Sequence, residues 1–85
     1  MKTEVVMVGQ KGLQAFSEIQ KVTSAYQDIT HVSYDANEDI LVLDMKNEKG
    51  EEMKLTIDGV RRNRDVKHIV ELKFKDALSQ PPVDD

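Results

Sequence analysis

Apolar and polar residues alternate along three consecutive segments, residues 29–34, 40–45 and 52–57. Alternation with a period of two places successive side chains on opposite faces of a strand. One set of alternate residues is mostly apolar and predicts the covered face of a sheet: Thr30, Val32, Tyr34, Leu41, Leu43, Met45, Met53, Leu55 and Ile57. The connections at residues 35–39 and 47–50 are rich in Asp, Asn and Gly, which are typical of tight turns. Residues 29–57 therefore predict three antiparallel strands.

Two elements precede this stretch. Residues 3–8 form a β-branched and mostly apolar run that ends at Gly9, which predicts a strand buried on both faces or near the middle of the sheet. Residues 13–27 predict an amphipathic helix. Its apolar stripe consists of Ala15, Phe16, Ile19, Val22, Thr23 and Tyr26. Because only this side is apolar, we expect the helix to lie on the sheet.

The segment from residue 66 to residue 78 fits two structures. As a helix it has a broad apolar stripe with Leu72 as the exception, and as a strand it alternates with Ile69 as the exception. We favour a strand through Lys75, because the alternation is long and rich in valine. The chain is thus predicted to be an α+β domain with a mostly antiparallel sheet of four or five strands and one helix on one face. The element order is β-α-β-β-β-β, or β-α-β-β-β-α if the last segment is helical.

With 85 residues, the chain is long enough for one domain, which we assign to residues 1–78. Residues 79–85, which contain two prolines and two aspartates, are predicted to be a disordered acidic tail. The apolar run near the N-terminus has only four residues, whereas a secretory segment needs roughly 7–15 and a membrane span about 20. We therefore expect a cytoplasmic protein without a membrane partner.

Charge is distributed unevenly along the chain, whose formal net charge is -4. Residues 35–58 contain eight acidic and three basic residues, whereas residues 61–75 contain six basic and two acidic residues. The basic residues form a candidate charged binding patch: Arg61, Arg62, Arg64, Lys67, Lys73 and Lys75. Such a patch suits nucleic-acid phosphates, but only Phe74 is nearby as an aromatic stacking platform. We favour pairing of these cations with acidic turns of the same sheet or of a second subunit.

The candidate catalytic and metal-binding motifs are incomplete. Asp35, Asn37 and Asp39 have the spacing of the first ligands of a calcium loop, but Ile40 and Lys46 stand where the loop needs Gly and Glu.

His31, Ser33 and Asp35 share a strand face with neighbours about 7 Å apart, too far for a nucleophile and its base. Residues 9–12, Gly-Gln-Lys-Gly, lack the remainder of a phosphate-binding loop. We therefore expect no enzymatic activity, no metal and no cofactor.

Several aliphatic residues are predicted to project from the sheet face that the helix does not cover. These are Ile29, Ile40, Val42 and Ile69, together with either Val6 or Val8. Such a surface is more aliphatic than a monomer usually exposes, so it is a candidate interface. The sequence thus favours a small interaction or regulatory module that binds protein and forms a homodimer through its open sheet face. The alternative is a nucleic-acid-binding protein that uses the basic segment 61–75.

Overall fold

The structure is a computed structural model, and it describes residues 2–79. The elements in chain order are β1 (Lys2–Val8), α1 (Gly12–Ala25), β2 (Asp28–Asp35), β3 (Ile40–Lys46), β4 (Glu52–Asp58), α2 (Arg64–Lys73) and the short 3-10 turn η1 (Ala77–Ser79). Apart from Ser79, the predicted acidic tail lies outside the described residues.

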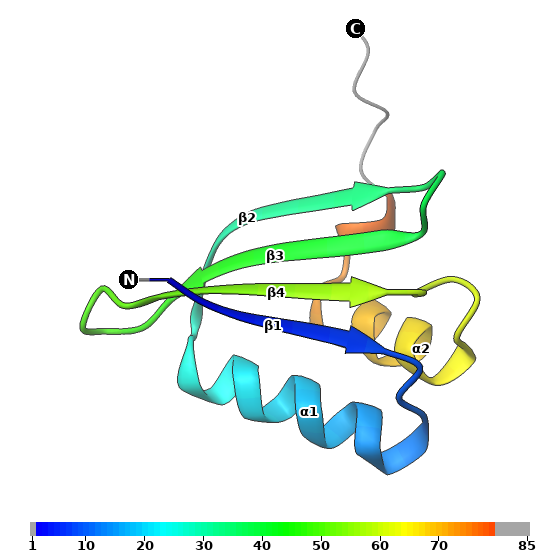
Figure 1. The fold of residues 1–85 in the computed structure, drawn as a ribbon, viewed down its shortest axis with the longest axis horizontal. Helices are drawn as coiled ribbons and strands as arrows, with labels where there is room; N and C mark the ends of the chain where they lie inside the picture. The colour runs from blue at the N-terminus through cyan, green and yellow to red at the C-terminus, as the bar shows by residue number, and fades with distance from the viewer. Residues whose placement is uncertain (1, 80–85) are drawn as a thin grey trace, which may run out of the picture.

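The four strands form one sheet in the order β1-β4-β3-β2. β2, β3 and β4 are joined as successive antiparallel neighbours, whereas β1 pairs with β4 in parallel. Figure 1 shows both helices beneath the same face of this sheet, so the described part of the molecule has two layers. The predicted α+β class with a mostly antiparallel sheet is therefore confirmed. The predicted place of the first strand is wrong, because β1 lies at an edge of the sheet.

The core fills the space between the sheet and the two helices. The sheet contributes alternate residues of β3 and β4, including Leu41, Leu43 and Leu55, each with no exposed surface. Ile19 of α1 and Val70 of α2 are equally buried against them. These burial patterns agree with the period of two predicted for the strands and with the helical spacing predicted for residues 13–27.

The last segment is a helix, so its prediction as a strand is wrong and the alternative order β-α-β-β-β-α is correct. Asn63 caps α2, with its side-chain oxygen accepting a hydrogen bond from the backbone N–H of Val66 at 3.3 Å. The buried residues Val66, Ile69 and Val70 have helical spacing, which lets one face of α2 cover the sheet. No helix in residues 2–79 is both long enough and apolar enough to cross a membrane.

Candidate interaction surface

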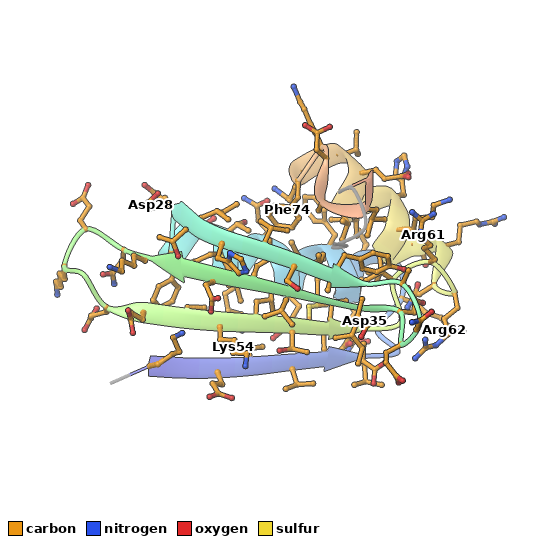
Figure 2. The ribbon with its side chains drawn as sticks, turned by 90° about the horizontal axis from the view of Figure 1, so that it is seen from above. Asp28, Asp35, Lys54, Arg61, Arg62 and Phe74 are labelled. Atoms are coloured by element: carbon orange, nitrogen blue, oxygen red, sulfur yellow. The ribbon has the colours of Figure 1, made fainter. Side chains whose placement is uncertain are left out.

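One face of the sheet is covered by α1 and α2, and the other face, here called the outer face, is covered by no described element. Figure 2 looks onto this outer face, on which Lys54 is labelled. The cross-strand register places these residues on it: Lys2, Glu4, Val6 and Val8 of β1; Glu52, Lys54, Thr56 and Asp58 of β4; Ile40, Val42, Asp44 and Lys46 of β3; and Asp28, His31, Ser33 and Asp35 of β2.

One half of the outer face is partly apolar. Val6 and Val8 expose 62% and 61% of their surface, and Ile40 and Val42 lie half-buried two strands away. Thr56 stands between Val6 and Val42 in the register of the sheet. These four aliphatic residues form a candidate contact surface, which is interrupted by Thr56 and by Asp58, the latter between Val8 and Ile40.

The other half of the outer face is charged, and the signs of the charges alternate. Neighbours across the strands always pair a basic with an acidic residue, as in Lys2 with Glu52 and Glu4 with Lys54. The same holds for Asp44 with Lys54 and for Lys46 with Glu52. The Nζ atom of Lys2 also reaches diagonally to Oδ1 of Asp44, at 3.2 Å. Opposite charges placed in this way favour the sheet, because like charges directly opposite each other destabilise a strand pair.

Two residues predicted for this surface lie elsewhere. Ile29 pairs with the buried Met45, because the register of β2 shifts between Ile29 and His31. This irregularity turns Ile29 toward the helical layer, where it lines a hollow with Tyr26 and Phe74. The prediction that Ile29 projects from the outer face is therefore wrong.

Ile69 is the second misplaced residue. It belongs to α2 and exposes only 7% of its surface, because it packs into the core. The prediction failed because it assumed a strand in this segment, and a strand would have turned Ile69 to the opposite face. Of the four residues predicted to form an interface, Ile40 and Val42 do lie on the outer face.

The basic segment does not form one continuous patch. Arg61 and Arg62 lie in the connection between β4 and α2, Arg64 begins α2, and Lys75 follows its end. At 100° per residue, Lys67 and Lys73 point about 120° apart around α2. The helix therefore separates lysines that a strand would have placed on one face.

Arg61 and Arg62 are instead held by Asp39, in the turn between β2 and β3. The carboxylate of Asp39 accepts hydrogen bonds from the backbone N–H groups of Arg61 and Arg62, at 2.9 and 3.1 Å. The guanidinium of Arg62 also forms salt bridges with Asp39 and Asp58, at 3.3 and 2.7 Å. The guanidinium of Arg61 lies over the Tyr34 ring, 5.6 Å from its centroid. Both arginines thus contribute to the attachment of the loop to the sheet.

Asp39 and Tyr34 affect each other's ionisation. Burial alone would raise the pKa of the Asp39 carboxyl, but hydrogen bonds from the Tyr34 hydroxyl and from the backbone of Arg61 and Arg62 outweigh it and lower that pKa. Burial and the hydrogen bond to Asp39, whose oxygen lies 2.6 Å away, raise the pKa of the Tyr34 hydroxyl.

The sequence pattern did not reveal this role of Asp39, because its partners lie 22 and 23 residues further along the chain. Its positive φ of 58° is a conformation that Asp tolerates better than most residues.

The candidate catalytic and metal motifs do not assemble into a site within residues 2–79. His31, Ser33 and Asp35 lie along the exposed outer face of β2. No group of three or more His, Asp or Glu residues in this part of the chain could hold a metal ion.

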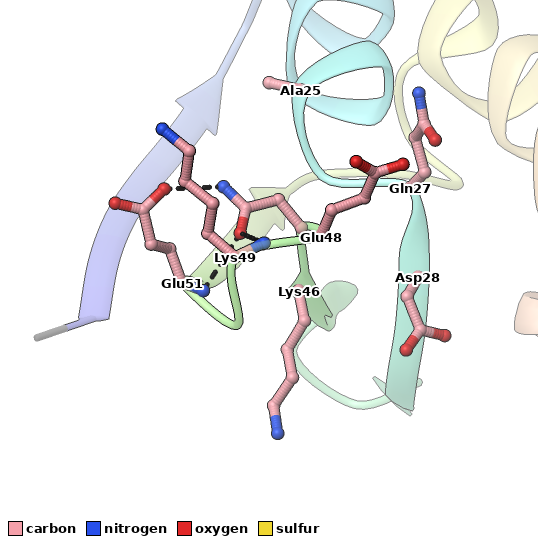
Figure 3. A pocket seen from close by; sticks show the side chains of 8 residues that line it. Ala25, Gln27, Asp28, Lys46, Glu48, Lys49 and Glu51 are labelled. Carbon is pink, nitrogen blue, oxygen red and sulfur yellow. Dashed lines mark hydrogen bonds between the residues drawn. The ribbon is translucent and has the colours of Figure 1, made fainter.

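A hollow of about 670 Å³ lies beside the turn between β3 and β4 (Figure 3). The side chain of Asn47 organises this turn, accepting hydrogen bonds from the backbone of Lys49 and Glu51 and donating one to the Glu51 carboxylate. Lys46 and Asp28 also line the hollow (Figure 3). The hydrogen bonds of Asn47 stabilise the turn between β3 and β4.

Comparison with known proteins adds no family to this geometry. No protein-family model matches the chain, and no curated protein sequence or solved structure is significantly similar to it.

Proposed function

We propose that the protein is a small non-enzymatic interaction module that forms a homodimer through the outer face of its sheet. The observation that carries this proposal is the exposure of Val6 and Val8, above 60% each, on a face that no described element covers. Complete burial of a valine side chain stabilises an association by about 1.5–3 kcal/mol. A symmetric contact between two copies buries Val6 and Val8 of both chains, which makes four valines in each dimer.

The size of the outer face favours a weak dimer. Strand spacing of 4.8 Å and a rise of 3.3 Å per residue give the four strands an area of about 14 Å by 20 Å. This footprint, roughly 300 Å² on each copy, is smaller than the roughly 800 Å² per partner of a standard specific interface and suits only a weak, transient association. We therefore expect a dissociation constant in the micromolar range, as in transient associations.

The charges of the outer face favour a second copy of the chain as the partner. Although the whole chain carries a net charge of -4, the charged half of the outer face alternates four acidic residues with three basic residues: Glu4, Asp28, Asp44 and Glu52 with Lys2, Lys46 and Lys54. An alternating pattern meets its own copy with opposite signs when the two copies are offset by one position. Electrostatic complementarity of this kind selects the partner and its orientation.

The mass of the protein in solution tests the proposal. Sedimentation equilibrium between about 5 and 500 µM should show a mass that rises from 9.7 kDa toward twice that value. Val6→Glu should keep the protein monomeric over the same range, because it places two like charges into the contact of each dimer. Far-UV circular dichroism confirms that the variant remains folded.

Leu13→Glu is the matched control, because Leu13 is 83% exposed on α1, away from the outer face. This variant should associate like the unmodified protein. A mass of one chain at every concentration would contradict the proposal, and so would equal effects of Val6→Glu and Leu13→Glu.

A further inference from the structure

The two edges of the sheet differ in their protection against a further strand. β2, at one edge, has an irregular register between Ile29 and His31, and the turn η1 contacts it. β1, at the other edge, pairs with β4 in an unbroken register from Lys2 to Val8 (Figure 1). Bulges and covering segments are common protections of an edge strand. Among residues 2–79, nothing pairs with the free side of β1, so this edge is open to another strand.

The side chains of β1 also leave its free side accessible. β1 contains no proline, and its residues on the covered side, Thr3, Val5 and Met7, are uncharged. Its two charged residues, Lys2 and Glu4, belong to the outer face. Prolines and inward-pointing charges are further devices by which a sheet edge avoids pairing. β1 has neither, so its free backbone groups can pair with an extended chain.

We propose that the free edge of β1 binds an extended segment of another protein, which adds to the sheet as a strand antiparallel to β1. Backbone hydrogen bonds give such a segment its affinity, and its alternate side chains give specificity. The antiparallel direction is favoured because antiparallel pairing is slightly more stable per residue than parallel pairing. The edge is separate from the outer face, so the proposal does not depend on homodimerisation.

The neighbour that β1 already has, β4, indicates which side chains suit its charged end. Glu52 lies opposite Lys2, and Lys54 lies opposite Glu4. Opposite charges across a strand pair stabilise it, whereas like charges destabilise it. We therefore expect the bound segment to place an acidic residue opposite Lys2, a basic residue opposite Glu4, and apolar or β-branched residues opposite the two exposed valines.

A second copy of β1 matches these charges less well. Directly opposite residues of an antiparallel pair share a face, so a symmetric pair of β1 strands joins outer residues only with outer residues. With all seven residues paired, Lys2 meets Val8 and Glu4 meets Val6. A shift of two residues brings Glu4 opposite Val8 or opposite the second Glu4. The register that pairs Lys2 with Glu4 joins residues 2–4 alone. Charge matching therefore favours a segment of different sequence.

The C-terminal residues of the chain match the edge no better. Residues 80–85 include no basic residue to oppose Glu4, and Pro81 and Pro82 have no N–H group to donate to a ladder. Both comparisons favour a segment of another protein.

Binding of a designed peptide to the full-length chain tests the proposal. The peptide contains the sequence Thr-Ile-Val-Ile-Lys-Thr-Glu, which in antiparallel register places Lys opposite Glu4 and Glu opposite Lys2. Titration followed by the amide NMR signals of the chain should give a dissociation constant of about 100 µM. The signals that shift should be centred on β1 and its neighbour β4, and those of β2 should stay in place.

Methylation of the peptide backbone distinguishes strand addition from other modes of binding. Alternate N–H groups of a strand point to opposite edges, so only one alternate set can pair with β1. Methylation of that set should weaken binding by about tenfold or more, and methylation of the other set by less than about twofold.

Glu4→Lys should weaken binding of this peptide by about threefold and strengthen binding of a peptide with its Lys and Glu exchanged. Asp28→Lys is the matched control, because Asp28 lies opposite Lys46 at the other edge as Glu4 lies opposite Lys54. This control should change neither affinity. Circular dichroism checks that both variants fold.

Several results would overturn the proposal: no saturation at millimolar peptide, shifted signals centred on β2, equal effects of the two methylated sets, or equal effects of Glu4→Lys and Asp28→Lys. A peptide of residues 2–8 that binds as tightly as the designed peptide would overturn it in favour of a second copy. Absence of the homodimer in sedimentation would leave all these measurements unchanged, so the two proposals fail separately.

Discussion

The two faces of the sheet are built from the same strands but have different surroundings. In β3, Leu41, Leu43 and Met45 expose at most 1% of their surface, whereas Ile40 and Val42, which alternate with them, remain half-buried. The covered side of β3 and β4 is apolar at every position, and both helices close this face of the sheet. The outer face has four aliphatic residues in one half, interrupted by Thr56 and Asp58, and charged residues in the other half, and the described helices leave it open.

This difference separates two uses of apolar residues. Residues of the covered face stabilise the fold of a single chain, because burial occurs on folding. Val6 and Val8 of the outer face stay exposed in the single chain, and under the proposed dimerisation they would be buried only on association. Substitutions on the two faces should therefore affect different measurements.

The largest effect is expected for Leu43→Ala. Leu43 is fully buried at the centre of β3, so its truncation leaves a cavity and should lower the free energy of unfolding by about 3 kcal/mol. The adjacent Val42→Ala, on the outer face, should lower it by less than about 1 kcal/mol. Urea unfolding at low micromolar protein concentration, followed by circular dichroism, measures both. Equal losses for the two variants would remove the distinction between the faces.

Asp39→Asn should have the next largest effect, because Asp39 joins the turn between β2 and β3 to the connection between β4 and α2. Asn keeps the side-chain shape and tolerates the positive φ but loses the charge that the hydrogen bonds and the Arg62 salt bridge use. We expect a loss of about 2 kcal/mol in the free energy of unfolding, typical of charge-assisted hydrogen bonds. Glu38→Gln, in the same turn, is the control and should change stability by less than about 0.5 kcal/mol.

The pH dependence of unfolding should reveal the same carboxylate. Because the pKa of Asp39 is lower in the folded than in the unfolded chain, its stabilisation is present above the ordinary value of 3.8 and is lost as pH falls through the folded pKa. Tyr34 acts in the opposite direction, since its raised pKa stabilises the fold below pH 10.0 and loses this effect at higher pH. Thermal unfolding across pH 2–7 should show a shallower acid decline for Asp39→Asn. Identical acid profiles would argue against this role of Asp39.

The smallest effect on the fold is expected for Val6→Thr. Thr retains the β-branched shape, and Val6 is largely exposed in the single chain, so the free energy of unfolding should change by less than about 0.5 kcal/mol. Self-association should weaken more, by about tenfold in the dissociation constant, because each dimer loses two buried methyl groups. Sedimentation equilibrium measures this change, and a dissociation constant that stays the same would exclude Val6 from the contact.

Sequence alone determined the parts of this protein that depend on local periodicity. The alternation in residues 40–46 and 52–58 and the Gly50 turn between them produce β3 and β4 as predicted, because each pattern suits only one local structure. The stripe of Ala15, Ile19 and Val22 likewise produces α1. The candidate positions Ile40 and Val42 followed from the same alternation.

Tertiary structure decided what the local pattern left open. Residues 66–78 fit a strand and a helix almost equally, and a helix is what covers the remaining part of the sheet with Val66, Ile69 and Val70. The irregularity at Ile29 and the edge position of β1 arise from pairing with strands distant in sequence. The bonds of Asp39 with Arg61 and Arg62 span more than twenty residues. Such contacts form only when the chain folds back on itself, so no nearby residue pattern records them.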